Sequence, residues 1–155
     1  MIIRCMFRTL GIERTYDNAL HVRGAPTYAS RDGIEVPEHK SFWKATPSGS
    51  LQIQIHKDEP LAQLFEPGGY VYLDILDGDV VADVPADAIR TSWHTSKVIL
   101  FTESAFRIEY TANRSRPSWC YSGELAIDVT NLDAWPELRI DPGGARGKMI
   151  AFSKA

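Results

Sequence analysis

The residues of this chain best suited to chemistry are carboxylates, and they are concentrated in one stretch. Between Asp58 and Asp87 the sequence has eight acidic residues and no Lys or Arg. They are Asp58, Glu59, Glu66, Asp74, Asp77, Asp79, Asp83 and Asp87. Because the whole chain has 20 acids and 17 bases, this stretch carries a charge of about −8 and the rest about +5. A surface of one sign attracts partners of the opposite sign, so we expect a basic partner here.

The same acids allow two other interpretations. Asp77-Gly78-Asp79 could offer oxygen ligands to a hard cation such as calcium. The alternation of acids typical of calcium loops does not continue beyond this triplet, and Gly78 suits a tight turn, so we predict no metal site. The remaining interpretation is a solvated hairpin whose charges keep a sheet edge soluble.

The four histidines, at positions 21, 39, 56 and 94, form no metal-binding pattern such as H-x-H or H-E-x-x-H. His94-Thr95-Ser96 resembles one half of the paired signature of two-histidine phosphoesterases, in which each histidine does acid or base work on a phosphodiester. The segments that begin at His21 and His56 do not supply the second half. An enzyme of phosphoester or small-molecule chemistry, centred on His94 with Ser96, is therefore an alternative function. We expect no cofactor.

Large aromatic residues and two cysteines complete the reactive inventory. The tryptophans are Trp43, Trp93, Trp119 and Trp135. An exposed row of them could stack on sugar rings or anchor a protein interface. Cys5 and Cys120 are too few to indicate a disulfide framework, and we favour buried free thiols in a reducing compartment over a disulfide between them.

The totals describe one ordinary globular domain over residues 1–155. The chain has 44% apolar and 24% charged residues and a net charge of −3, which argues against disorder and gives no sign of nucleic-acid binding. No apolar run approaches the roughly 20 residues of a membrane span, and Arg4 and Arg8 interrupt the N-terminal apolar stretch. We expect a cytoplasmic protein that does not bind membranes, with an oligomeric state that the sequence leaves open.

The elements that must position these residues are mostly strands. In residues 50–56, Leu51, Ile53 and Ile55 alternate with polar residues, a pattern typical of a half-buried antiparallel strand. We predict further strands at 3–8, 70–76, 80–84, 97–102, 105–111, 119–129 and 149–152. Short helices are expected within 58–65 and 85–92, and a long loop within 17–40. We find no internal repeat.

About nine short strands separated by Gly and Pro turns predict an all-β, mainly antiparallel fold, either a sandwich or a small barrel with one or two short helices. An α+β roll is the alternative.

On this fold we expect a small soluble binding protein that uses the acidic surface of residues 58–87 to bind or inhibit a basic macromolecular partner. Immunity proteins and phage-encoded inhibitors are analogues in size and charge only. The expected contact residues are Asp74, Asp77, Asp79, Asp83 and the aromatic Trp93. A carbohydrate-binding sandwich that uses exposed tryptophans is a further alternative.

Overall fold

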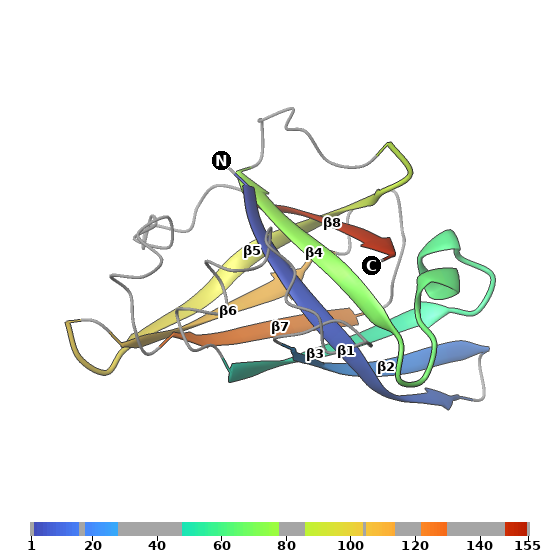
Figure 1. The fold of residues 1–155 in the computed structure, drawn as a ribbon, viewed down its shortest axis with the longest axis horizontal. Coiled ribbons are helices and arrows are strands. Elements are labelled where there is room, and N and C mark those ends of the chain that lie inside the picture. Colours follow the sequence, from blue (N-terminus) through green and yellow to red (C-terminus); the bar gives the residue numbers. More distant parts are fainter. Residues whose placement is uncertain are drawn as a thin grey trace.

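The protein is a closed antiparallel β-barrel (Figure 1). The structure is a computed structural model that describes residues 2–15, 18–27, 48–77, 86–103, 105–113, 122–129 and 148–154. The strands in these residues are β1 (Ile2–Arg14), β2 (Ala19–Pro26), β3 (Ser48–His56), β4 (Tyr70–Asp77), β5 (Ile89–Leu100), β6 (Phe106–Ala112), β7 (Ser122–Val129) and β8 (Lys148–Lys154). A short 3-10 helix, η2 (Pro60–Leu64), lies between β3 and β4.

The order of the strands divides the barrel into two halves. Around the barrel they follow the sequence β1-β2-β3-β7-β6-β5-β8-β4. The first four strands therefore lie in the spatial order β4-β1-β2-β3, and the last four in the order β8-β5-β6-β7. Each is the 4-1-2-3 order of a Greek key. The halves meet at two antiparallel seams, where β3 pairs with β7 and β4 pairs with β8.

Side chains along each strand alternate between the barrel interior and its outer wall, as the pleat of a strand requires. In β3, Leu51, Ile53 and Ile55 are buried, while Gln52 is exposed. Large side chains from both halves fill the interior. The ring centroid of Phe152 lies 6.5 Å from that of Trp93 and 6.0 Å from that of Phe65. The barrel is thus a packed core closed at one end by the residues around η2.

An approximate two-fold axis relates the halves, because equivalent positions face one another across the β3–β7 seam. The facing pairs there are Leu51–Leu125, Gly49–Ile127 and Ile53–Gly123. The pattern is symmetric about the Leu51–Leu125 pair. On the opposite wall, the corresponding central pair of the β4–β8 seam is Asp74–Ala151.

Local irregularities repeat in the same way. β1 has a bulge between Thr9 and Gly11, and β5 has one at the matching position between Thr95 and Lys97. Two backbone hydrogen bonds of the first half also recur in the second. Thr15 N–H to Ala19 O (2.8 Å) is matched by Phe101 N–H to Ala105 O (2.9 Å), and Thr27 N–H to Met6 O (3.0 Å) by Asn113 N–H to Ser92 O (2.9 Å).

The symmetry identifies a short internal repeat in the sequence. The pattern Ser-Gly-x-Leu-x-Ile begins β3 at Ser48 and begins β7 at Ser122. Its Leu and Ile face the barrel interior in both halves. The expectation of no internal repeat was therefore wrong: the repeat is visible only once the two strands are known to be equivalent.

The fold confirms the all-β, antiparallel prediction and decides for a small barrel against a sandwich. The predicted strand at 50–56, the hairpin formed by 97–102 and 105–111, and the closing strand at 149–152 are confirmed. The predicted helix at 85–92 is wrong, because β5 begins at Ile89, and the predicted loop at 17–40 contains β2. The predicted strand at 80–84 and residues 119–121 lie outside the described residues.

Candidate functional site

Asp74, one of the predicted partner contacts, is fully buried and paired. The Arg4 guanidinium donates from Nε to Asp74 Oδ1 at 2.7 Å and from its NH2 group to Oδ2 at 3.0 Å. The Arg4 guanidinium carbon also lies 5.0 Å from the Tyr72 ring centroid. The carboxylate therefore links β4 to β1 and is not available to a partner, which corrects the expectation for Asp74. The side chains of Asp77, Asp79 and Asp83 lie outside the described residues, and their role stays a prediction.

Four other acids of the 58–87 stretch gather at one end of the barrel, and we call them the acidic rim: Asp58, Glu59, Glu66 and Asp87. The first three flank η2, which lies beside the end of β8 (Figure 1). Glu66 accepts a hydrogen bond from Lys154, at the end of β8, at 3.5 Å. Asp87 lies two residues before β5, whose first residue, Ile89, pairs close to that same end of β8. The side chain of Asp58 is 75% exposed.

Trp93, the predicted aromatic contact, is inside the barrel with no exposed surface. Its indole Nε1–H donates to Thr91 Oγ1 at 2.7 Å, and the Thr91 hydroxyl donates to Ile150 O at 2.6 Å. The expectation of an exposed Trp93 is thus wrong, because the ring packs in the core with its N–H bonded internally. The other three tryptophans lie outside the described residues.

His94 is exposed on the outer wall of β5. Its Nδ1 lies 2.6 Å from Asn113 Oδ1, and the Asn113 amide donates to Ser92 Oγ at 2.8 Å. Ser96 sits at the bulge of β5 and donates to the backbone oxygen of Glu109 at 3.1 Å. Within the part of the chain that the structure describes, no titratable side chain is hydrogen-bonded to His94. Its contacts are those of a hydrogen-bonded surface histidine.

Cys5 is a free thiol buried in the barrel. Burial raises its pKa well above the ordinary value, and the nearby Asp74 carboxylate raises the pKa further. A thiol in this state is a poor nucleophile. Cys120 lies outside the described residues.

Neither metal ligation nor a membrane-spanning helix is found in the described ranges. No group of three or more His, Cys, Asp or Glu side chains there could hold a metal ion. No helix among these residues is long and apolar enough to cross a membrane.

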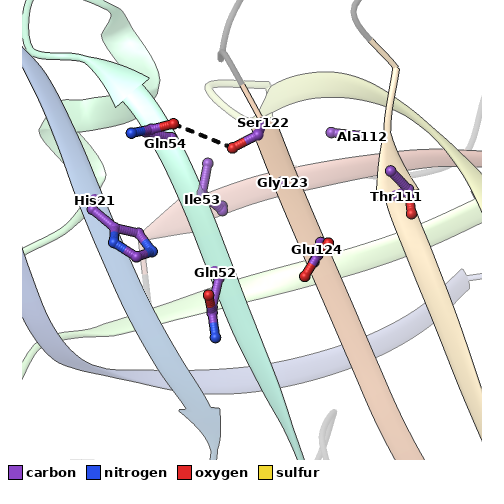
Figure 2. Close-up of a pocket in the computed structure, with 9 residues that line it drawn as sticks. All are labelled: His21, Gln52, Ile53, Gln54, Thr111, Ala112, Ser122, Gly123 and Glu124. Atoms are coloured by element: carbon purple, nitrogen blue, oxygen red, sulfur yellow. Dashed lines mark hydrogen bonds between the residues drawn. The ribbon is translucent and has the colours of Figure 1, made fainter. Parts of the chain in front are cut away.

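A pocket of about 440 Å³ opens over the wall formed by β2, β3, β7 and β6 (Figure 2). Its lining residues are His21, Gln52, Ile53, Gln54, Thr111, Ala112, Ser122, Gly123 and Glu124. This volume is within the range of small-molecule and side-chain binding pockets. The close-up shows the carboxamides, hydroxyls, imidazole and carboxylate of this set drawn from four neighbouring strands.

Strand pairing places the polar lining residues in two rows. His21 of β2 lies opposite Gln54 of β3, which lies opposite Ser122 of β7. One step along the strands, Gln52 lies opposite Glu124, which lies opposite Thr111 of β6. The outward side of a strand recurs at every second residue, so the two rows share the outer face of the wall.

The pocket contains a single fixed charge among its described lining residues, the carboxylate of Glu124. The hydrogen bond from Ser122 Oγ to Gln54 Oε1, at 3.5 Å, is at the limit of hydrogen bonding. The side chains of His21, Gln52 and Glu124 make no hydrogen bond or ion pair with other residues that the structure describes. Their polar groups therefore face the pocket without protein partners from these segments.

The symmetry-related position on the same wall has the opposite character. There Arg107 replaces His21, Asp128 replaces Gln54 and Ser48 replaces Ser122. Arg107 donates from NH1 to Asp128 at 3.2 Å and from Nε to Glu109 Oε1 at 3.0 Å, and Ser48 donates to Asp128 Oδ2 at 3.2 Å. These partners raise the pKa of Arg107, with the Glu109 hydrogen bond as the largest cause. One half of the wall is closed by its own ion pairs, while in the other half His21, Gln52 and Glu124 have no partner among the residues that the structure describes.

Sequence reasoning missed this pocket because its residues come from separate strands and share no motif. The repeated Ser-Gly-x-Leu-x-Ile pattern would have aligned β3 with β7 and so revealed Gln54 and Asp128 as equivalent positions.

Neither the models of known protein families nor the curated protein sequences contain a match to this chain.

Proposed function

We propose that this protein binds a macromolecular partner with a basic surface and inhibits or neutralises that partner. The observation that supports the proposal is the acidic rim. Glu59 and Asp87 make no ion pair with a described residue, and the ion pair of Asp58 is a 3.7 Å approach to His56. Such carboxylates are available to a partner's lysines and arginines.

The proposal assigns the contact to the acidic rim. Asp77 ends β4, whereas the rim lies where β4 begins. One partner surface of standard size therefore engages the η2 end without needing Asp77.

The test begins with capture of the partner from the native host, with the protein as bait. The double variant Asp58→Asn, Asp87→Asn should then associate more slowly, roughly fivefold at low salt, because opposite charges mainly accelerate association. The difference should shrink at physiological salt.

The matched control is Glu103→Gln, an exposed acid in the turn between β5 and β6. The turn between β5 and β6 lies at the end of the barrel away from η2 (Figure 1), and this variant should associate at the wild-type rate. Equal rates for the wild type and the double variant at both salt concentrations would remove the acidic rim as the functional surface.

A further inference from the structure

We infer that the polar pocket on the β2-β3-β7-β6 wall receives an arginine side chain of the basic partner. The inference rests on the proposed function for the identity of the partner. It adds a specific recognition site to the general attraction of the rim.

The charge of the pocket selects a cationic ligand. Glu124 is the one charged lining residue among those that the structure describes, and it is exposed and unpaired there. The residues next to these two rows on the neighbouring strands do not neutralise the charge of Glu124. Arg23, beside Gln52, lies 3.9 Å from Glu13, and His94, beside Thr111, is bonded to Asn113.

The arrangement of acceptors favours a guanidinium over an ammonium. A guanidinium has five N–H donors in a fixed plane, whereas a lysine has three donors on one nitrogen. The oxygens of Gln52, Gln54, Thr111 and Glu124 are spread over three adjacent strands, and neighbouring strands lie about 4.8 Å apart. A planar fork reaches several of these acceptors at once, and a compact ammonium does not.

The equivalent site in the other half holds a guanidinium on the same wall. There, Arg107 donates to Asp128, which corresponds to Gln54, and to Glu109, which corresponds to Arg23. The fold thus accommodates a guanidinium beside the Gln54 position, and Glu124, which corresponds to Ser50, supplies the negative charge in the open half. In the open half the arginine is replaced by His21, so the guanidinium would come from outside.

The pocket is also close enough to the rim for one partner to contact both. Gln54 lies near the end of β3, and Asp58 follows four residues later, about 13 Å along an extended chain. His56, between them, is bonded to the Asp58 backbone N–H at 3.2 Å.

The probe for the test is N-acetyl-arginine amide, titrated into the full-length protein and followed by the chemical shifts of backbone amides. We expect saturable shifts confined to β2, β3, β6 and β7 around the pocket. The citrulline analogue has the same shape without the charge and should cause none, and the lysine analogue should bind at least threefold more weakly. Shifts of equal size with the citrulline analogue, or no saturable shifts, would overturn the inference.

Two variants test the site itself. Glu124→Gln should weaken arginine binding at least fivefold, while Glu103→Gln should leave it unchanged. The double variant His21→Arg, Gln54→Asp copies the ion pair of the closed half into the pocket. It should remain folded, by circular dichroism, and lose arginine binding. Wild-type binding by Glu124→Gln, or by the folded double variant, would contradict the inference.

The rim variant separates this result from the proposed function. Asp58→Asn with Asp87→Asn should bind N-acetyl-arginine amide like the wild type, because neither residue lines the pocket. Failure of arginine binding together with a rim-dependent association rate would reject the pocket and keep the proposed function. Arginine binding without any effect of the rim variant on the association rate would keep the pocket as an arginine site and reject the acidic rim as the functional surface.

Discussion

At the scale of single residues, the pairing of Asp74 with Arg4 shows how a surface-like sequence pattern can conceal an internal role. The carboxylate belongs to the longest acidic stretch of the chain, yet it has no exposed surface and accepts two hydrogen bonds from one guanidinium. Bidentate pairs of this kind are the strongest charge-assisted hydrogen bonds in proteins. Loss of the carboxylate takes both of these hydrogen bonds from Arg4, whose side chain is 23% exposed.

We therefore expect Asp74→Asn to destabilise the fold by about 3 kcal/mol, the lower end of the range for loss of one partner of a buried pair, because Arg4 is partly exposed. Denaturation by urea measures the change in the free energy of unfolding. Glu103→Gln, an exposed acid, is the control and should shift stability by no more than about 0.5 kcal/mol. A similar small effect for both variants would show that the Arg4 pair does not support the barrel.

The sequence could identify the acids but not which of them would be buried. Asp74 lies on the outer face of β4, where alternation predicts exposure, and its ion-pair partner Arg4 is 70 residues away in the chain. The prediction that Trp93 is exposed was wrong for a different reason. The residues on either side of Trp93 are polar, so the local sequence does not show which face of the strand is buried. Inside the barrel, the indole N–H donates to Thr91, two residues earlier.

At the scale of elements, the strands were predictable because alternation is a local property. β3, β6 and β8 were located within two residues at each end. β2 was missed because its alternation is short: only Leu20 and Val22 carry it before Gly24. Pairing with β1 and β3 on either side supports a strand that this short pattern did not predict. Residues 85–92 contain the start of β5 because pairing with β8 prevails over helix propensity.

The two seam glycines give a prediction at this scale. A Cβ on Gly49 would meet the backbone oxygen of Ala126, whereas one on Gly123 would meet Trp93 Cη2 at 2.8 Å and the Ala112 Cβ at 3.0 Å. Backbone of a paired strand cannot move without loss of the ladder, while a side chain can shift.

We expect Gly123→Ala to cost about 1–3 kcal/mol, the usual range for overpacking, and Gly49→Ala to cost more. Urea denaturation of both variants ranks them, with Ser50→Ala as a control on the exposed face of the same strand. A smaller effect at Gly49 than at Gly123 would show that the β3–β7 seam can separate locally.

At the scale of the whole molecule, the two Greek keys behave as two partners joined by the chain between residues 77 and 89. The junctions between them are the β3–β7 and β4–β8 seams. Joining two binding modules by a short linker makes their association intramolecular, with an effective concentration in the millimolar range. The barrel closes in this way without depending on the concentration of the protein.

This arrangement also determines which halves can assemble. Two copies of the first half, pairing through β4, would place Asp74 opposite Asp74, where the barrel has the small and fully buried Ala151. A larger side chain at a buried position is destabilising. The second half has Ala151 at that position. Fragments of residues 1–85 and 86–155, produced together, should therefore co-purify as a one-to-one complex. The first fragment alone should not form a dimer in size-exclusion chromatography. We therefore expect Asp74 to direct each half to its complement and away from a copy of itself.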